Sequence, residues 1–227
     1  FTNIHEIKKL WIAAQNKINL DNKIKFFKTH QINCKIDGFN FTNKLNTLAT
    51  IYIVRDPRSL VNSISNHYDK SIEDAKEFLI TPKTQGSSKS IHNLKTGQVV
   101  TLIGNWSENY KFWKQNNENF LLIKYENLLD NIDNELEKIV VFLKKYIDFD
   151  VNDKKLQNII NTTNFHNLKK MEEEGSFNEN AYTESLNKKI NFFYQGPENN
   201  WKSKLESKIV DEINLKFKHE MIELGYL

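Results

Sequence analysis

The chain has little cysteine and no long apolar run, and each shortage excludes a class of protein. Only one cysteine, Cys34, stands among 227 residues, so no disulfide can form within the chain and nothing argues for an oxidising compartment. No apolar run approaches the roughly 20 residues that a membrane helix requires. The histidines, Cys34 and the acidic residues also lack the spacing of metal ligands. The sequence therefore predicts a cytoplasmic protein with no membrane span and no bound metal.

The chain also has little excess charge of either sign. The net charge is +3, and the lysines are scattered and mostly offset by nearby acidic residues. A solvated lysine surface explains this pattern better than a nucleic-acid footprint does, so we expect no nucleic-acid partner. Charged residues make up 27% of the chain and hydrophobic residues 39%, which is ordinary for a globular protein. The length suits a single domain over residues 1–227.

Arginine is scarce, and its two positions are informative. Arg55 and Arg58 are the only arginines among 32 basic residues, and both lie in the segment 51–63. The chain is rich in Lys, Asn and Ile, which hints at a nucleotide bias that converts most surface arginines to lysine. An arginine that persists is expected to need its planar, bidentate fork, which lysine cannot supply. The segment therefore predicts an anion site, with phosphate favoured over a simple ion pair between an arginine and Asp56.

Apolar periodicity and turn residues predict strands that alternate with helices. Strands are expected at 23–29, 49–55 and 120–124. Helices are expected over 1–20, 56–68, 71–80, 101–115, 132–146, 153–160, 165–172 and 201–223, with loops over 81–100 and 176–190. This alternation is typical of an α/β fold in which a parallel β-sheet is flanked by helices. Ligands of such folds bind beyond the carboxyl ends of the strands.

Arg55 is the last residue of the strand predicted at 49–55, so it is expected at such a carboxyl end. Asp56 is a favourable N-cap and Pro57 suits the first helical position, so a helix is expected to begin there. Its N-terminus and Arg55 would face the same anion, which would receive charge and hydrogen bonds together. Ser63 lies about two turns along this helix and adds a hydroxyl.

Two further segments carry possible chemistry. Lys28 and His30 follow the first predicted strand and project to the same side of an extended chain. A histidine there can act as a general base and a lysine can neutralise a leaving oxygen, although a solvated histidine is an open alternative. In the segment 192–202, Gly196 is suited to a backbone cradle for a second anion, and an ordinary turn before the last helix is the alternative.

Taken in order, these segments resemble the sulfotransferases that use 3′-phosphoadenosine 5′-phosphosulfate (PAPS), over about residues 20–227. The elements that match are Lys28-Thr29-His30, Arg55 with Ser63, Gly104-Asn105-Trp106, Tyr125-Glu126, Thr163-Asn164-Phe165 with Met171, and Gly196 through Trp201-Lys202. The resemblance implies the P-loop NTPase-like sulfotransferase fold. It also implies PAPS as co-substrate, with no metal.

The resemblance assigns roles to individual residues. His30 would deprotonate the acceptor, and Lys28 would stabilise the bridging oxygen as the sulfuryl group leaves. The residues that would bind the nucleotide are Arg55 and Ser63 at the 3′-phosphate, Tyr125, Thr163 and Phe165 around the adenine, and the backbone of Gln195 and Gly196 at the 3′-phosphate.

Two departures from the family pattern stand out. The family places Arg-Lys before its late glycine, whereas this chain has Tyr194 and Gln195, so one charged phosphate contact is lost. The family also begins with a strand and a Pro-Lys-Ser-Gly-Thr-Thr loop around the 5′-phosphosulfate, and the chain has no such run. Because the sequence opens on Phe1, we expect the fold to be incomplete at the N-terminus, without its first strand and phosphosulfate loop.

The leading hypothesis is therefore an enzyme. It would be a sulfotransferase that moves a sulfuryl group from PAPS to a hydroxyl or amine of a small-molecule or carbohydrate acceptor, by in-line displacement. Whether the chain as given is active stays open. The alternative is a non-catalytic nucleotide- or carbohydrate-binding module of the same fold. An ordinary nucleoside-triphosphate hydrolase is disfavoured, because the chain has no Gly-Lys-Ser/Thr loop.

Overall fold

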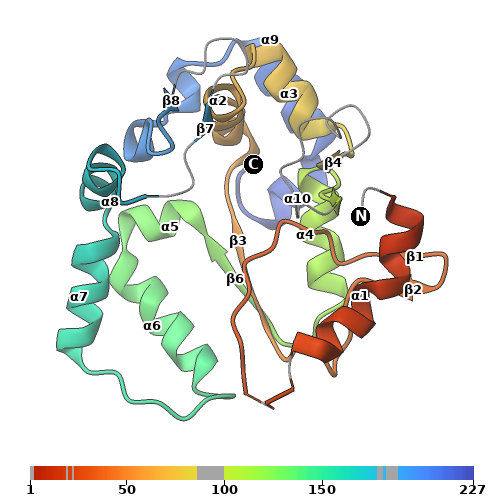
Figure 1. Cartoon of the computed structure of the whole chain (residues 1–227). Coiled ribbons are helices and arrows are strands. Elements are labelled where there is room, and N and C mark those ends of the chain that lie inside the picture. The colour runs from red at the N-terminus through yellow and green to blue at the C-terminus, as the bar shows by residue number, and fades with distance from the viewer. Residues whose placement is uncertain (1–2, 19, 22, 86–99, 178–180, 183–188) are drawn as a thin grey trace. The chain divides into compact units, whose positions relative to one another are not determined.

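The chain is divided into two compact units, shown in the computed structural model of Figure 1. The structure describes residues 3–18, 20–21, 23–85, 100–177, 181–182 and 189–227. The first unit comprises Phe1–Tyr52 and Thr81–Leu122, and the second comprises Ile53–Ile80 and Ile123–Leu227. Most of the predicted loop 81–100 (residues 86–99) and residues 178–180 and 183–188 of the predicted loop 176–190 lie outside the described residues. Within the described part of 81–100, Thr84–Gln85 form a short strand instead of a loop.

The first unit is built around helix α1, two short hairpins and helix α4. Its elements are α1 (Ile4–Ile18), β1 (Lys35–Ile36), β2 (Phe39–Asn40), β4 (Thr84–Gln85), β5 (Thr101–Leu102) and α4 (Trp106–Gln115). Ile7, Trp11 and Val100 form its buried cluster, and Phe41 packs edge-on against Trp11 with ring centroids 5.6 Å apart. Helix α4 begins at Asn105, whose side chain and Glu108 form a capping box.

Strands β3 (Thr50–Val54) and β6 (Phe120–Lys124) pair with each other and confirm two of the three predicted strands. In the first unit the Thr50 N–H donates to the Asn119 carbonyl at 2.8 Å, where both strands begin. In the second unit the Asp56 N–H donates to Glu126 Oε1 at 2.9 Å, just after both strands end. Matching starts and matching ends mean that the two strands run parallel.

The strand predicted at 23–29 is wrong. Residues 23–34 have no regular secondary structure, and Phe26 and Phe27 are 67% and 69% exposed. A run of Lys, Ile and Phe has the right propensity, but a strand also needs a partner to take up its N–H and C=O groups. Among the described residues, no strand pairs with this segment.

The second unit is mostly helical. Its helices are α2 (Pro57–His67), α3 (Ile72–Ile80), α5 (Tyr125–Asp130), α6 (Ile132–Leu143), α7 (Asp153–Thr163), α8 (Phe165–Glu173), α9 (Ser207–Lys216) and α10 (Lys218–Glu223), with 3-10 turns η2 (Gly196–Glu198) and η3 (Trp201–Ser203). A short pair of strands, β7 (Ala181–Tyr182) and β8 (Lys189–Ile190), is antiparallel. Helices α2, α3 and α9 pack together, and Val61, Leu79 and Ile213 are buried there.

Several helix starts follow the predicted caps. The Asp56 side chain accepts from the Arg58 N–H, and Pro57 is the first residue of α2. The Ser71 hydroxyl accepts from the Asp74 N–H at 3.0 Å and donates back to its carboxylate at 2.7 Å. These local contacts satisfy N–H groups that a helix leaves unpaired at its start.

The predicted single helix at 201–223 is instead broken into η3, α9 and α10. The break between α9 and α10 falls at Phe217, whose ring is fully buried. Met221 and Leu224 are buried beyond it, at spacings of four and three residues that keep them on the same helical face as Phe217, so the apolar face continues through the break.

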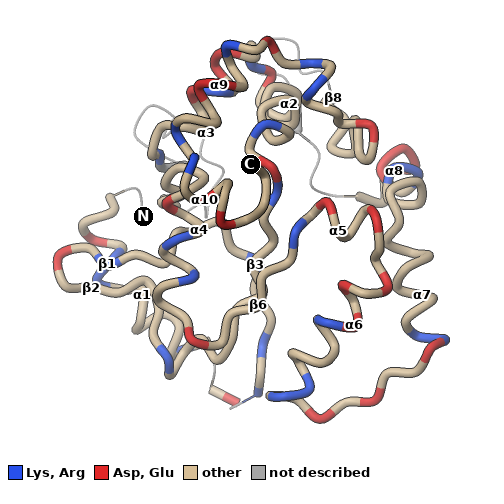
Figure 2. Tube along the Cα trace, turned by 180° about the vertical axis from the view of Figure 1, so that it is seen from behind, with Lys and Arg blue, Asp and Glu red and all other residues tan. Residues whose placement is uncertain are grey.

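Basic and acidic residues are interspersed along the trace of both units (Figure 2). No described helix combines the length and the apolar character needed to span a bilayer.

Candidate nucleotide-binding site

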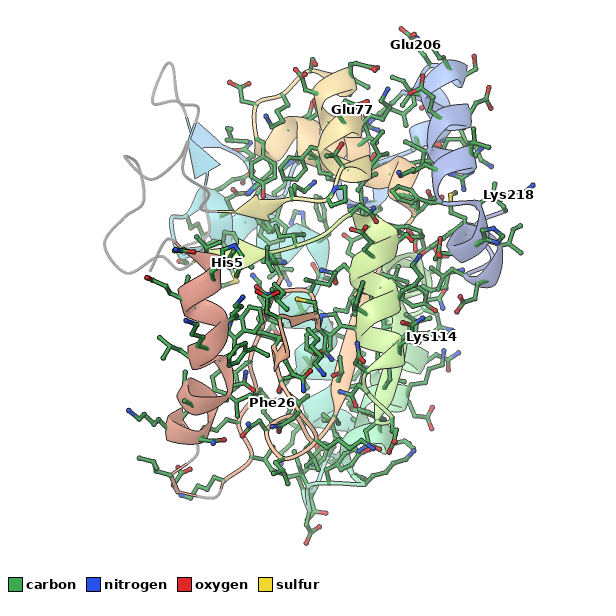
Figure 3. All side chains as sticks on the ribbon, turned by 90° about the vertical axis from the view of Figure 1, so that its right-hand side faces the viewer. His5, Phe26, Glu77, Lys114, Glu206 and Lys218 are labelled. Atoms are coloured by element: carbon green, nitrogen blue, oxygen red, sulfur yellow. The ribbon has the colours of Figure 1, made fainter. Side chains whose placement is uncertain are left out.

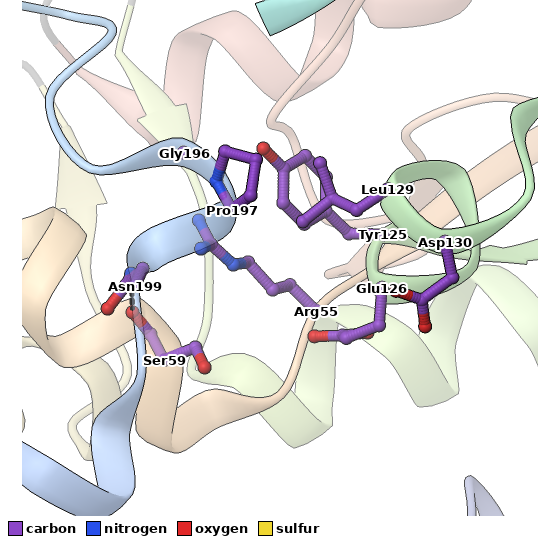
Figure 4. Close-up of a pocket in the computed structure, with 9 residues that line it drawn as sticks. All are labelled: Arg55, Ser59, Tyr125, Glu126, Leu129, Asp130, Gly196, Pro197 and Asn199. Carbon is purple, nitrogen blue, oxygen red and sulfur yellow. Dashed lines mark hydrogen bonds between the residues drawn. The ribbon is translucent and has the colours of Figure 1, made fainter.

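The second unit contains a cavity of about 200 Å³ just past the end of β3 (Figure 4). It is lined by Arg55, Ser59, Tyr125, Glu126, Leu129, Asp130, Gly196, Pro197 and Asn199. Three chain segments meet here, namely the start of α2, helix α5 and the turn η2. The cavity thus lies beyond the carboxyl ends of two parallel strands, where ligands of α/β folds bind.

Arg55 extends across this cavity from the end of β3 toward Gly196 and Pro197, as Figure 4 shows. Its guanidinium lies 4.4 Å from the centroid of the Tyr125 ring, and its Nη1 donates to Ser63 Oγ at 3.2 Å. Stacking on an aromatic ring holds a guanidinium in one plane, with its N–H groups pointing outward from the edge of that plane. Three of the predicted nucleotide-binding residues therefore come together here.

Arg58 has a different environment, although it lies only three residues further on. Its side chain is buried, and Nη2 contacts the Asp56 carboxylate and the Tyr226 carbonyl, both at 2.8 Å. The Trp201 ring lies 3.9 Å from its guanidinium carbon. The ion pair with Asp56, one of the two alternatives for this segment, thus holds for Arg58. This arginine joins η3 and the C-terminal segment to α2.

The start of α2 offers fewer free donors than its dipole suggests. Pro57 has no N–H, and the Arg58 N–H already donates to Asp56 Oδ1 at 2.9 Å. Positive charge in the cavity therefore depends mainly on the Arg55 guanidinium.

Glu126 is placed by backbone and tyrosine contacts rather than by an arginine contact. Its Oε1 accepts from the Asp56 N–H at 2.9 Å, and its Oε2 accepts from the Tyr226 hydroxyl at 2.9 Å. Burial and the neighbouring Glu126 carboxylate raise the pKa of Tyr226, so this hydroxyl stays protonated and remains a donor. Part of the negative charge of Glu126 is thereby compensated inside the fold.

Gly196 is required by its surroundings. Its φ is +51°, and an added Cβ would lie 2.5 Å from Cδ2 and Cζ of Phe165. The Phe165 ring therefore lies flat against the backbone that borders the cavity, at the start of α8. Glu172, buried on the same helix, accepts from the N–H groups of Phe192 and Phe193 at 2.6 and 2.9 Å. Helix α8 thus positions the turn that carries Gly196.

Asn199 is a cavity residue that the sequence did not suggest. Its Nδ2 donates to the Ser59 carbonyl at 2.9 Å and to Ser63 Oγ at 3.2 Å. No spacing pattern pointed to it, because it reaches α2 from a turn far along the chain. Ser59 and Leu129 were also missed, although each lies four residues from a predicted site residue, Ser63 and Tyr125, on the same helix.

The remaining predicted residues lie elsewhere. Thr163 is exposed at the end of α7, where its hydroxyl donates to the Ile159 carbonyl at 2.6 Å. Gln195 lines a second hollow of the same unit, described below. Lys28 and His30 belong to the first unit, where both are exposed. Within the described ranges, no group of three or more His, Cys, Asp or Glu side chains could hold a metal ion.

Comparisons with known proteins give a family match and similar solved structures. The sequence matches the family profile described as "Sulfotransferase domain" over residues 11–225. Mouse sulfotransferase SULT7A1 complexed with PAP is 20% identical, with a TM-score of 0.49, and the match covers 76% of this chain and 58% of that one. Retinol dehydratase in complex with androsterone and inactive cofactor PAP is 18% identical, with a TM-score of 0.50 and coverage of 76% and 47%. A search of curated proteins gave no match.

Proposed function

The chain belongs to the sulfotransferase domain family and has its α/β fold, and from this premise we propose that it uses PAPS as sulfuryl donor for a hydroxyl or amine acceptor. The family match runs through both units, which supports one sulfotransferase-like domain over 1–227. The chain spans only 58% and 47% of the two solved chains, so the activity of the whole protein is part of this proposal.

The observation that carries the proposal is the environment of Arg55. A guanidinium that stacks on Tyr125 and contacts the Ser63 hydroxyl presents a planar, always-charged donor edge, and Ser59 lines the same cavity. A ribose 3′-phosphate provides acceptor oxygens of matching geometry. Tyr125 and Phe165 would contribute aromatic surface next to the base, and the Gln195–Gly196 backbone would contact the phosphate. Thr163 is proposed as a further adenine contact, and a structure with bound 3′-phosphoadenosine 5′-phosphate tests it.

The catalytic step is assigned to Lys28 and His30. In this proposal, His30 takes the proton of the acceptor hydroxyl while the acceptor oxygen bonds to sulfur. The bond from sulfur to the bridging oxygen breaks, and Lys28 neutralises the charge that develops on the departing 3′,5′-bisphosphate. Such a transfer depends mainly on in-line positioning and on charge stabilisation, which a histidine and a lysine can supply without a metal.

Calorimetric titration with 3′-phosphoadenosine 5′-phosphate tests the nucleotide site. We expect saturable binding by the native chain and an affinity lower by at least about tenfold in Arg55→Lys, because lysine keeps the charge but loses the bidentate fork. Lys154→Ala is the control, since Lys154 is exposed on α7 and outside the cavity. No heat at millimolar nucleotide, or equal affinity in Arg55→Lys and native chain, contradicts the proposal.

A non-catalytic nucleotide- or carbohydrate-binding module is the second candidate. The family has two basic residues at the positions of Tyr194 and Gln195. The loss of a charged phosphate contact there favours the non-catalytic module. The two candidates differ at His30, because His30→Ala abolishes sulfuryl transfer in the enzyme and changes nothing in the module. A small-molecule or carbohydrate acceptor and a cytoplasmic location stay predictions.

A further inference from the structure

The second unit holds another hollow, of about 460 Å³, compared with about 200 Å³ for the Arg55 cavity. It is lined by Asn62, Ser65, Asn66, Asp69, Lys70, Ile72, Ile190, Asn191, Tyr194 and Gln195. Its size falls in the range of small-molecule sites, which runs from about 300 to 1,000 Å³. The nucleotide site proposed above uses only the backbone of Gln195 among these lining residues, and it leaves their side chains without a role.

The lining of this hollow is polar but has no net charge. Four carboxamides contribute to it, those of Asn62, Asn66, Asn191 and Gln195, together with two hydroxyl side chains. One carboxylate and one ammonium, from Asp69 and Lys70, offset each other. A carboxamide offers both donors and acceptors, which matches a ligand hydroxyl group, itself both a donor and an acceptor. An anion would find no excess positive charge here, and an apolar ligand would leave the amides unpaired.

The walls of the hollow are held by bonds that leave acceptor atoms unused. Asn66 Nδ2 donates to the Asn191 carbonyl at 2.9 Å, and Asn62 Nδ2 donates to Asn199 Oδ1 at 3.2 Å. Both contacts use the donor end of an amide. Neither of these bonds uses the Oδ1 atom of Asn62 or of Asn66.

Gln195 supplies a sharper sign of a missing partner. Its Oε1 is buried and has no hydrogen-bond partner within the described part of the chain. A buried amide oxygen without a donor is destabilising, because it has lost its hydrogen bonds to water and gained none in the fold. The last torsion of a glutamine side chain is soft, so a small rotation would turn this amide toward a hydroxyl group in the hollow.

Tyr194 adds an aromatic surface at the edge of the hollow. Its side chain is 54% exposed, so much of the ring faces solvent. Aromatic rings offer a flat apolar face and, in tyrosine, a polar tip. The apolar face of a sugar ring, with hydroxyls around its rim, complements a tyrosine that stands beside amides.

We propose that this hollow binds a neutral saccharide of one or two sugar rings. The side-chain amides, including that of Gln195, form hydrogen bonds with its hydroxyl groups. Tyr194 packs against the face of one sugar ring. The proposal concerns a site separate from the Arg55 cavity and does not depend on PAPS binding.

Saturation-transfer difference NMR with glucose, galactose, N-acetylglucosamine and lactose tests the proposal. At least one of these sugars at millimolar concentration should receive saturation from the native chain, and inorganic sulfate should not compete with it. Signal from none of the four, or displacement by sulfate, overturns the proposal. Calorimetric titration of the same sample with nucleotide measures binding at the Arg55 cavity independently of sugar binding. A failure of one proposal can therefore be told apart from a failure of the other.

Two variants separate binding from folding. Tyr194→Ala and Gln195→Met should each weaken sugar binding by at least about tenfold, the effect of losing one ring contact or one amide. Gln195→Met also removes an unpaired buried oxygen, so its denaturation midpoint should equal or exceed that of the native chain. Gln157→Met, at an exposed position on α7, is the matched control and should bind normally. Native-like sugar binding in both site variants refutes the assignment.

Discussion

Replacing Gly196 by alanine tests how the fold builds the edge of the Arg55 cavity. The backbone there is in the left-handed region, at φ +51°, which costs an alanine about 1–2 kcal/mol. The added methyl would also overlap Phe165, with two ring carbons 2.5 Å away. Overpacking of this kind costs about 1–3 kcal/mol, so the total destabilisation should be about 2–5 kcal/mol.

Gly175 is a matched control for this change. Its φ is +77°, and an added Cβ would meet nothing within 4 Å. Gly175→Ala therefore carries the backbone cost alone, about 1–2 kcal/mol, and the effect of alanine on the unfolded chain is common to both variants. The difference between the two variants isolates the contact with the Phe165 ring.

Denaturant unfolding and nucleotide titration provide the assay. We expect Gly196→Ala to be less stable than Gly175→Ala by about 1–3 kcal/mol and to lose nucleotide affinity, which Gly175→Ala should keep. Phe165→Ala should cost less in the Gly196→Ala background than in the native chain, because the overlap disappears with the ring. Equal stability and equal nucleotide affinity of the two glycine variants would refute the reasoning.

The remaining predictions concern buried charges. Arg58→Lys should lower the free energy of unfolding by about 2 kcal/mol, because lysine cannot reproduce the fork to Asp56; an unchanged denaturation midpoint would contradict this. Lys76 on α3 contacts Glu73, Glu212 and, at 3.4 Å, Glu77, the last of which is labelled in Figure 3. The hydrogen bond from Lys76 lowers the pKa of Glu212 from its ordinary value of 4.5. The unfolded chain then binds the proton more readily, so this stabilisation is present above pH 4.5 and is lost as pH falls through the folded pKa. Thermal melts between pH 3 and 6 should show a shallower acid loss in Lys76→Met than in the native chain, and parallel curves would exclude the linkage.

Local sequence signals predicted the elements whose ends are set by neighbouring residues. The Asp56-Pro57 start of α2 and the Phe120–Lys124 strand follow from capping chemistry and from a short apolar run. The hairpin β1–β2 was missed, although Asp37-Gly38, with φ of 47° and 87°, is a strong turn signal between two short strands.

Elements that depend on distant partners were predicted less well. The run at 23–29 has the propensity of a strand but no pairing strand among the described residues, and the last helix breaks where Phe217 becomes buried. Asn199 could not be found from spacing either, because its contacts with α2 join residues about 140 positions apart. Propensity is a property of a few residues, whereas pairing and burial depend on the whole chain.

The sequence by itself determined that an arginine-bearing strand end and a capped helix stand together, because both features depend on neighbours within a few residues. It assigned the phosphate to Arg55 only through the family resemblance, and it left open which arginine would pair with Asp56. The tertiary structure decided that Arg58 is buried against Asp56 and Trp201, while Arg55 stacks on Tyr125 and lines a cavity. The physical reason is that the solvation of a charge and the choice of its partner are set by segments that meet only when the chain folds.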